Sequence, residues 1–346
     1  MSLPTVTVVV PARNASAWID MTLSSLVAQT YPKDRLEIIV VDDGSTDDTV
    51  AKATTLLTSS GVANTVLHNA SPQGPSAARN RGWRKGRGEW VQFLDADDLL
   101  DPSKISVQAH ATRDKGADVA VVFSRWGRLA CRDSRWTAEL PDTEPSIGAD
   151  PVFDLLRSDN FMATGSQLFR RTWLERVGGY VESYHFIEDV DLLLRIACQG
   201  GLVQVVPSAK PLFWYRQRAE SLAHSNDRGF IDGCLRNAGL AERYWREREE
   251  MTTPRARLLA DVYFMGARYY AEHDPEMFLT LTRDISRLAP GFVPTGPAAL
   301  RLLARILGYP RAERCAVQYR RLKRSVRGTP TTRERLRATP EQLGRP

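Results

Sequence analysis

Three carboxylates directly follow an apolar run in the stretch Val91-Gln92-Phe93-Leu94-Asp95-Ala96-Asp97-Asp98. A short apolar run that ends in a polar turn predicts a buried strand. In extended backbone Asp95 and Asp97 would point to the same side, because they are two residues apart. Carboxylates this close repel one another unless a cation or strong donors balance them, so the pair predicts a site for a hard divalent cation. A solvated turn is the alternative, although Asp101 before Pro102 already suits the cap of the next helix.

The composition indicates a globular protein of ordinary character. The 346 residues suit one large domain or two modest ones, and 42% of them are hydrophobic and 25% charged. No apolar run approaches the roughly 18 residues that span a membrane, and the first residues lack the charged region of a signal peptide. The four cysteines are far apart and form no C-x-x-C pair, which argues against a zinc site or a disulfide framework. We therefore expect a cytoplasmic protein.

The net charge of +6 is concentrated near the C-terminal end. Residues 298–346 contain thirteen Lys and Arg against three acidic residues, a net charge of +10, which leaves −4 for the first 297 residues. Nucleic acid is not an expected partner, because its binding would need a basic stripe on a recognisable module. One predicted helical face combines apolar and basic residues: Leu300, Leu303, Ile306 and Leu307 beside Arg301 and Arg305. Such a face can lie on the anionic inner surface of a cell membrane, or it can pack internally with its arginines in solvent, and both interpretations stay open.

Short apolar runs alternate with helical patterns in the larger, N-terminal part of the chain. The patterns predict strands at residues 5–10, 36–41, 65–68 and 90–94, with a helix after each of the first three. Later strands are expected at 117–123, 167–170, 202–206 and 212–215, and residues 127–147 read as an irregular polar loop. Near-continuous apolar strands that alternate with helices predict an α/β fold, with a mostly parallel sheet covered by helices on both faces.

Beyond this region the sequence patterns are helical. Helices are predicted at residues 229–250, 254–273, 275–288 and 297–307, separated by proline-containing breaks. We therefore predict an α/β domain at 1–223, a helical C-terminal domain or arm at 224–327 and a disordered basic tail at 328–346. The helical part could also support a homo-oligomer.

Acidic residues lie at the ends of several predicted elements. Asp42 and Asp43 end the second strand, and Glu188 and Asp189 precede a later helix. Because ligands of open parallel sheets bind beyond the carboxyl ends of the strands, these acids could share one edge with the Asp95 stretch. Taken alone, each cluster could equally shape a turn or complement a helix N-terminus.

A helix that opens at Gly74-Pro75-Ser76-Ala77 could add an anion site to this edge. The free N–H groups of a helix N-terminus suit a phosphate, and Arg79 and Arg81, one turn into the helix, could reach the same anion.

Seven separate motifs resemble the family-2 glycosyltransferases of the GT-A fold. They are Val8-Val9-Val10-Pro11-Ala12-Arg13-Asn14, Leu26-Val27-Ala28-Gln29-Thr30-Tyr31-Pro32, Ile39-Val40-Val41-Asp42-Asp43-Gly44-Ser45-Thr46-Asp47, Gly74-Pro75-Ser76-Ala77-Ala78-Arg79-Asn80-Arg81-Gly82, Phe93-Leu94-Asp95-Ala96-Asp97-Asp98, Val177-Gly178-Gly179-Tyr180 and Glu188-Asp189-Val190-Asp191-Leu192. The resemblance covers about residues 4–218 in order and spacing. It implies a Rossmann-like, mostly parallel sheet and an inverting, metal-dependent transfer of a sugar from a nucleoside diphosphate to an acceptor hydroxyl.

The same resemblance implies roles for residues at the nucleotide. Pro11, Ala12 and Asn14 would line the nucleotide pocket at the end of the first strand. Asp43, with Asp42, would bind the base. A UDP-sugar is the favoured donor, and the acceptor would be a glycan, a lipid-linked or a small-molecule hydroxyl, in bacterial glycan, polysaccharide or glycoconjugate synthesis.

Roles at the reacting centre are implied in the same way. Asp95 and Asp97 look like the family's D-x-D pair: Asp97 would bind Mn2+ or Mg2+ directly, and Asp95 with the adjacent Ala96 would contact the ribose or the sugar. Arg79 would approach the diphosphate or brace the acids. Asp189 matches the position of the catalytic base, with Glu188 beside it, and would take a proton from the acceptor hydroxyl.

Two other functions remain possible from the sequence. A nucleotidyltransferase that makes nucleotide sugars would need a glycine-rich loop after the first strand, where this chain has Pro11-Ala12-Arg13-Asn14. A non-catalytic binding protein of the same fold would not need the full set of acids that the chain carries.

Overall fold

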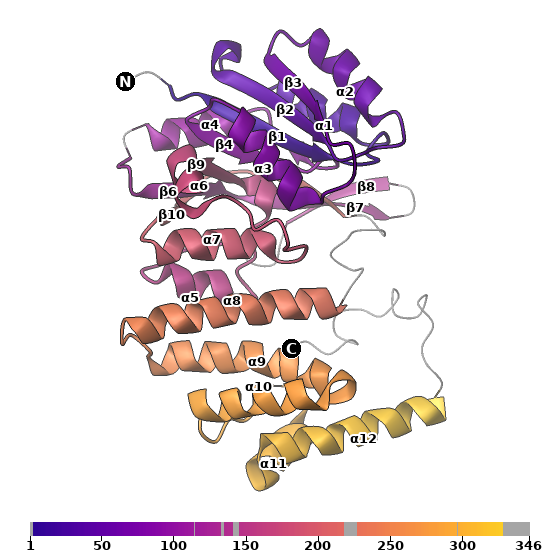
Figure 1. Cartoon of the computed structure of the whole chain (residues 1–346), viewed down its shortest axis with the longest axis vertical. Coiled ribbons are helices and arrows are strands. Elements are labelled where there is room, and N and C mark those ends of the chain that lie inside the picture. Colours follow the sequence, from indigo (N-terminus) through magenta and orange to yellow (C-terminus); the bar gives the residue numbers. More distant parts are fainter. Residues whose placement is uncertain are drawn as a thin grey trace. The chain divides into compact units, whose positions relative to one another are not determined.

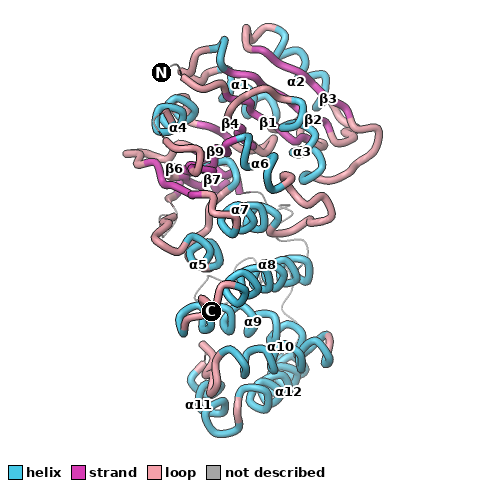
Figure 2. The backbone as a smooth tube through the Cα atoms, turned by 60° about the vertical axis from the view of Figure 1, so that its left-hand side comes forward, coloured by secondary structure: helices cyan, strands magenta, loops and turns pink. Residues whose placement is uncertain are grey.

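The computed structural model describes residues 3–113, 115–132, 135–140, 145–217, 227–295 and 297–327. The chain divides into two compact units, Met1–Gly229 and Phe230–Pro346 (Figure 1). Among the described residues, strands occur in the first unit and the second is helical (Figure 2). The basic tail predicted at 328–346 lies outside the described residues.

Seven strands of the described chain form the central sheet of the first unit. In sheet order they are β10 (Leu202–Val206), β6 (Val119–Ser124), β9 (Gln167–Arg170), β4 (Trp90–Phe93), β1 (Val6–Ala12), β2 (Leu36–Asp42) and β3 (Ala63–His68). β1 pairs in parallel with β2 and β4, β2 with β3, and β10 with β6, whereas β9 is antiparallel to both of its neighbours. The prediction of a mostly parallel α/β sheet is therefore confirmed.

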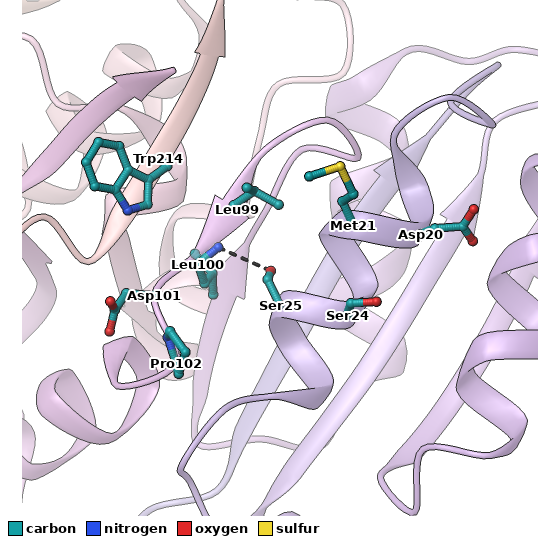
Figure 3. Close-up of a pocket in the computed structure, with 9 residues that line it drawn as sticks. All are labelled: Asp20, Met21, Ser24, Ser25, Leu99, Leu100, Asp101, Pro102 and Trp214. Atoms are coloured by element: carbon teal, nitrogen blue, oxygen red, sulfur yellow. Dashed lines mark hydrogen bonds between the residues drawn. The ribbon is translucent and has the colours of Figure 1, made fainter. Parts of the chain in front are cut away.

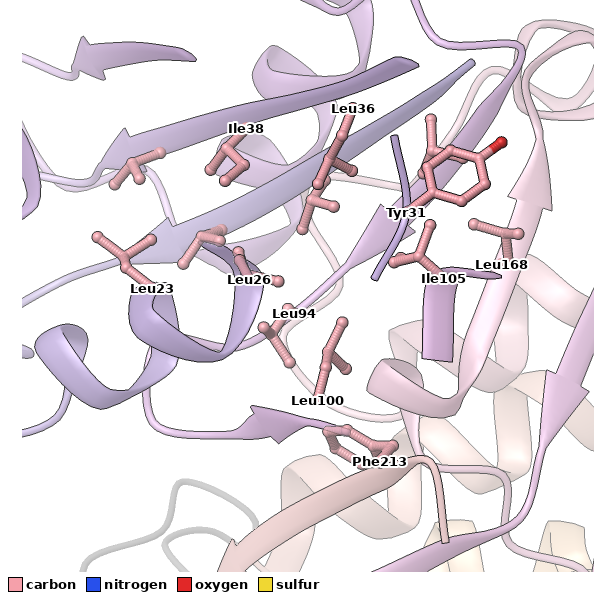
Figure 4. Packing of buried hydrophobic residues seen from close by; sticks show 14 of the residues in the cluster. Leu23, Leu26, Tyr31, Leu36, Ile38, Leu94, Leu100, Ile105, Leu168 and Phe213 are labelled. Atoms are coloured by element: carbon pink, nitrogen blue, oxygen red, sulfur yellow. The ribbon is translucent and has the colours of Figure 1, made fainter. Parts of the chain in front are cut away.

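Alternate residues of each strand point to opposite faces of this sheet, so apolar side chains emerge on both. Helices cover both faces. On one face α1 (Ile19–Val27) and α4 (Lys104–Thr112) contribute to a core that also contains Leu94, Leu100 and Phe213 (Figure 4). On the other face lies α3 (Pro75–Lys85), where a Cβ added at Gly82 would come within 2.3 Å of the Val9 side chain. Glycine thus lets this helix approach β1 closely and fixes where its side chains emerge at the sheet edge.

The remaining elements of this unit complete the two layers. They are α2 (Thr49–Thr58), α5 (Pro151–Leu156), α6 (Arg171–Val177), α7 (Glu188–Cys198) and the 3-10 turns η1 (Lys33–Arg35) and η2 (Thr164–Ser166). Buried aromatic rings pack between β4, β9 and the segment before α7, with Phe93 5.5 Å from Phe169 and 5.2 Å from Tyr180 between ring centroids.

A second sheet was not expected from the sequence. It has the order β5 (Leu99–Leu100), β11 (Phe213–Gln217), β7 (Trp126–Arg132) and β8 (Arg135–Glu139). The prediction of an irregular loop at 127–147 is therefore wrong over much of its length, since β7 and β8 pair antiparallel there. The hairpin escaped prediction because β8 is largely exposed and carries charged residues at both ends.

The described helices of the second unit are α8 (Asp227–Glu247), whose first residues belong to the first unit, α9 (Thr253–His273), α10 (Pro275–Leu288), α11 (Ala298–Leu307) and α12 (Tyr309–Arg327). Side-chain caps begin two of them, with Thr252 before α9 and Asp274 before α10. Phe264, Phe292 and Tyr309 form an aromatic cluster with centroid separations of 5.2–5.8 Å. No helix in the described part of the chain is both long and apolar enough to cross a bilayer.

Candidate functional site

The carboxylate stretch after β4 forms a turn. Ala96 and Asp97 occupy the turn, and the backbone N–H of Asp98 donates to the carbonyl of Asp95 over 3.0 Å. The expectation that Asp95 and Asp97 project from one side of an extended strand is therefore wrong. The strand ends at Phe93, before the acids. The acids are therefore brought together by a turn and not by the alternation of side chains along a strand.

Two contacts from distant parts of the chain hold this turn in place. The hydroxyl of Thr22 on α1 donates to the carbonyl of Ala96 over 2.9 Å. The backbone N–H of Arg216 on β11 donates to Oδ1 of Asp98 over 2.8 Å. The turn is thus tied to a helix that covers the main sheet and to the second sheet.

Arg79 joins the carboxylate turn to the N-terminus of α7. Its Nη2 lies 2.8 Å from Oδ1 of Asp95 and its Nη1 lies 2.9 Å from Oε1 of Glu188, and only 6% of its side chain is exposed. The guanidinium also lies 5.2 Å from the ring centroid of Tyr180. Burial disfavours the charged form, but Asp95 and the other neighbouring groups outweigh it and raise the pKa of Arg79 above its ordinary value. These ion pairs match the predicted role of Arg79 as a brace for the acids, and its approach to a diphosphate stays a prediction.

Asp189 lies in the first turn of α7. The residue before the helix, Ile187, has the left-handed φ of 57°, which turns the chain sharply into the helix. The hydroxyl of Thr164 donates to Oδ2 of Asp189 over 3.2 Å, and the backbone N–H of Val190 donates to Oδ1 over 2.9 Å. Burial, followed by the charge of Glu188, raises the pKa of Asp189 to about 6. The carboxylate is thus ionised at neutral pH and is still a better base than an ordinary aspartate.

Negative charge accumulates at the carboxylate turn. Burial and the charges of Asp97 and Asp95 raise the pKa of Asp98 well above its ordinary value. Within the described residues, no group of three or more His, Cys, Asp or Glu side chains converges into a closed metal site. Asp95 and Asp97 as ligands of a divalent cation therefore stay a prediction.

Asp43 occupies the position that the sequence suggested for a phosphate. Its carboxylate accepts the backbone N–H of Gln73 and of Gly74, each over 2.8 Å, and the side-chain amide of Asn69 over 2.7 Å. The expected phosphate site at the start of α3 is therefore wrong at Gly74, whose N–H already binds an anion of the protein itself. Asp42, also buried, accepts the N–H of Ser45 over 3.2 Å.

Arg81 does not share a ligand with Arg79. Its guanidinium donates to the carbonyl of His68 and to the side-chain oxygen of Asn69, at the end of β3. The expectation that both arginines reach the same anion is wrong, because side chains two positions apart on a helix face different directions.

The residues predicted to line the nucleotide pocket lie beside Asp43 at the end of β1. Pro11 is half-buried, and the carbonyl of Ala12 accepts the N–H of Asp43 over 2.8 Å. Asn14 has a left-handed φ of 47°, and its side-chain oxygen accepts the N–H of Thr46 over 2.8 Å. These contacts fix the loops after β1 and β2 against one another.

A separate groove of about 440 Å³ lies between α1 and the second sheet (Figure 3). Met21, Ser24 and Ser25 line it from α1, and Leu99 and Trp214 line it from β5 and β11. The groove contains none of the acidic residues predicted for the site, so it is not the site that the carboxylates form.

Sequence reasoning missed several residues that build the site. They are Thr22, Thr164, Tyr180 and Arg216, which contact the backbone of the carboxylate turn, the acids or Arg79 from four different elements or loops. Only Tyr180 carried a signal, since it lies in the motif Val177-Gly178-Gly179-Tyr180. The two threonines have no local pattern that distinguishes them from surface threonines.

The sequence model described as Glycosyl transferase family 2 matches residues 7–178. This range contains β1, β2, α3 and the carboxylate turn, and it ends before Asp189. Succinoglycan biosynthesis protein ExoO of Rhizobium meliloti is 31% identical over 222 residues, which cover 62% of each chain. An uncharacterized glycosyltransferase of Haemophilus influenzae is 31% identical over 108 residues, or 31% of this chain and 42% of the relative. This chain thus spans less than two thirds of the length of either relative.

TarS of Staphylococcus aureus, a poly(ribitol-phosphate) beta-N-acetylglucosaminyltransferase, is similar in both sequence and structure. It is 31% identical over 115 residues, or 33% of this chain and 20% of TarS. The crystal structure of TarS 1-349 in complex with UDP-GlcNAc matches 91% of this chain and 92% of that chain, with a TM-score of 0.64 and 17% identity. The structural similarity shows a shared GT-A-type fold.

Proposed function

Because this chain belongs to glycosyl transferase family 2, we propose that it transfers a sugar from a nucleoside diphosphate donor to an acceptor hydroxyl, with inversion at the anomeric carbon. The double ion pair of Arg79 with Asp95 and Glu188, at 2.8 and 2.9 Å, carries the proposal. This arginine brings the carboxylate turn and the start of α7 into one site. Inverting transfer needs both parts, because one stabilises the departing diphosphate and the other removes a proton from the attacking hydroxyl.

Asp189 is the general base in this proposal. A base is most effective when its pKa lies near the working pH, and burial raises the pKa of Asp189 to about 6. Glu188 does not take the proton, because its carboxylate pairs with Arg79. It acts instead by keeping Arg79 in place and by its charge on Asp189.

The donor occupies the edge formed by the loops after β1, β2 and β4. Asp42 and Asp43, with Pro11, Ala12 and Asn14, contact the nucleoside, and Asp95 with Ala96 contacts the ribose or the sugar. Asp97, with Asp95, holds a divalent cation, Mn2+ or Mg2+. When bound, such a cation offsets the negative charge of the leaving diphosphate.

The donor is a UDP-sugar and the acceptor is a hydroxyl of a bacterial glycan or lipid-linked glycan. The name of TarS supports N-acetylglucosamine as one candidate sugar, and the name of ExoO supports polysaccharide synthesis as the setting.

A panel of nucleotides tests the proposal. First, the thermal shift of the protein is measured with UDP, GDP and dTDP, with and without Mn2+. Then the release of nucleotide is measured from the nucleotide sugar that contains the stabilising diphosphate. We expect one nucleoside diphosphate to stabilise the protein in the presence of Mn2+. The protein should then release this diphosphate from the corresponding nucleotide sugar. Asp97→Asn should raise the Mn2+ concentration that is needed. Asp101→Asn is the matched control, because Asp101 pairs with Lys210 at 2.7 Å.

The other outcomes identify the alternatives. Turnover that requires a sugar phosphate and a nucleoside triphosphate would identify a nucleotidyltransferase. Nucleotide binding with no release from any sugar donor would identify a non-catalytic binding protein.

The surface of α11 and α12 supports a peripheral position on the inner face of a cell membrane. Leu300 and Ala304 are buried against Ala312, so the apolar face predicted from Leu300 to Leu307 is partly internal. Leu302 and Ile306 are 58% and 68% exposed, and Tyr319 and Leu322 are each 65% exposed. Up to residue 322, where the side chains of these helices are described, the exposed arginines are Arg301, Arg305, Arg311, Arg314 and Arg321. Apolar residues set among cations match an anionic lipid surface.

Vesicle flotation tests this location. The protein should float with vesicles that contain phosphatidylglycerol and not with neutral phosphatidylcholine vesicles. Leu302→Ser with Ile306→Ser should reduce flotation, whereas Met277→Ser with Leu279→Ser, exposed at 39% and 36% on α10, should not. Equal flotation of both double variants would contradict the membrane surface.

A further inference from the structure

Three consecutive carbonyl groups near the site are each bound by a buried side chain. The carbonyl of Gly165 accepts from Nε2 of Gln92 over 3.0 Å, and that of Ser166 accepts from Nε2 of Gln108 over 2.8 Å. The carbonyl of Gln167 accepts from Nζ of Lys104 over 3.1 Å. The donors come from β4 and α4, so two elements fix one short piece of backbone, η2 and the start of β9.

These donors lie in the interior of the first unit. Gln92, Gln108 and Lys104 have no exposed surface. Burial of an amine disfavours its charged form, and the pKa of Lys104 is well below its ordinary value. The side-chain oxygens of Gln92 and Gln108 have no hydrogen-bond partner among the described residues. Buried polar groups of this kind oppose folding, but they restrict the backbone to one position.

Packing restricts the same backbone from the other side. A Cβ added at Gly165 would lie 2.1 Å from Cε2 of Phe213, a buried residue of β11. The turn therefore has no room to move toward the second sheet, and the three donors hold it on its carbonyl side.

The residue at the start of this restrained turn is Thr164, whose hydroxyl donates to Oδ2 of Asp189 over 3.2 Å. The other carboxylate oxygen already accepts the N–H of Val190. Within the described part of the chain each oxygen of Asp189 thus has one donor, and the hydroxyl defines the direction in which the carboxylate plane faces.

We propose that Thr164 is a positioning residue for Asp189, and that Gln92, Gln108 and Lys104 act through the backbone of residues 165–167 to hold its hydroxyl in place. The inference rests on the proposed function, because it assigns Asp189 the role of the base. Thr164 does not touch the substrate, but it sets the orientation and ionisation of Asp189, which does.

The proposal predicts a shift in titration. A hydrogen bond to the carboxylate favours its charged form, so removal of the hydroxyl should raise the pKa of Asp189. The other groups that act on this carboxylate are Glu188, which raises its pKa, and Arg79, which lowers it, with Tyr180 close by. All three remain in a Thr164 variant.

The test compares Thr164→Val with Thr164→Ser, which keeps a hydroxyl. Carbon-13 NMR of aspartate carboxyl groups, assigned with Asp189→Asn, follows the titration of Asp189 without any need for activity. We expect Thr164→Val to move it upward by roughly half to one pH unit and Thr164→Ser to restore most of the difference. Thr172→Val, an exposed threonine on α6, is the matched control and should leave the titration unchanged.

Activity gives the second readout. With the donor found by the nucleotide panel, Thr164→Val should lose more activity at pH 6 than at pH 8, with nucleotide affinity unchanged. Gln108→Met should shift the titration in the same direction by a smaller amount. An unchanged Asp189 titration in Thr164→Val would overturn the proposal whether or not the protein is a glycosyltransferase. A shifted titration without sugar transfer would keep the positioning contact and remove the proposed function.

Discussion

The backbone N–H of Arg216 donates to Oδ1 of Asp98 over 2.8 Å, although 118 residues separate the two along the chain. The Arg216 guanidinium lies 4.6 Å from the ring of Trp18 and 5.4 Å from that of Trp136. The residue that holds the carboxylate turn therefore contacts two indoles, whose ring centroids lie 6.0 Å apart. One belongs to the segment before α1 and the other to β8.

Removal of the Asp98 acceptor should loosen the turn that carries Asp95 and Asp97. We expect Asp98→Ala to weaken Mn2+-dependent nucleotide binding by about tenfold or more, because a buried N–H loses its partner. Asp98→Asn keeps an oxygen that can accept this bond and should bind more tightly than Asp98→Ala. Calorimetric titration of the preferred nucleoside diphosphate measures both affinities, and equal affinities would contradict a role for this bond.

Replacement of Arg79 should destabilise the first unit and impair the site together. Arg79→Met leaves the carboxylates of Asp95 and Glu188 without their shared cation, and breaking a buried pair costs about 3 kcal/mol. Urea unfolding measures the free energy of unfolding.

Arg84→Met on the same helix is the matched control. Arg84 pairs with Glu182 at 3.2 Å, with about half of each side chain exposed. Such surface pairs contribute roughly 0–1 kcal/mol. An equally small loss in Arg79→Met would argue that its ion pairs do not hold the two parts of the site together.

The rate of sugar transfer should depend on the ionisation of Asp189. The base acts as the carboxylate, so activity should be constant at neutral pH and fall about tenfold per pH unit below its pKa of about 6. A profile of kcat/KM against pH measures this limb. Asp189→Asn should lower kcat by about 10²–10⁴ and leave nucleotide binding intact, as expected for loss of a general base. If the residual activity of Asp189→Asn still falls at low pH in the same way, the fall is due to another group.

Stability should depend on pH through Lys104. The pKa of this buried amine is lowered on folding, whereas the unfolded chain keeps a value near roughly 10.4. Between these two values the unfolded state binds one more proton, so stability rises with pH by up to about 1.4 kcal/mol per unit. The Lys104→Met variant lacks this rise in stability with pH. Its stability relative to the original protein should therefore fall as the pH rises from 7 to 9 in urea unfolding, and a constant difference would contradict the lowered pKa of Lys104.

The sequence predicted the main sheet because its signals are local. Each of β1, β2 and β4 is mostly apolar and largely buried on both faces, and the helices between them favour parallel pairing. The second sheet gave no comparable signal. β11 pairs with β5 and β7 from distant parts of the chain, and exposed strands tolerate polar residues.

The site could be predicted at the level of its acids but not of their partners. Asp95, Asp97 and Asp189 follow from motifs, and the parallel sheet brings strand ends to one edge. The competition for the N–H of Gly74 could not be foreseen, because a phosphate and the carboxylate of Asp43 suit a helix N-terminus equally well.

The amino-acid sequence alone thus determined which charged residues lie at the sheet edge. The patterns that predict a strand and the turn after it extend over only a few residues. Tertiary structure decided which of those charges neutralise one another. Arg79 could have faced a diphosphate, yet it faces Asp95 and Glu188, because the packing of α3 on β1 and the sharp entry into α7 bring three segments to hydrogen-bond distance. Ion pairs and hydrogen bonds form only over a few ångströms, and only the folded chain sets such distances.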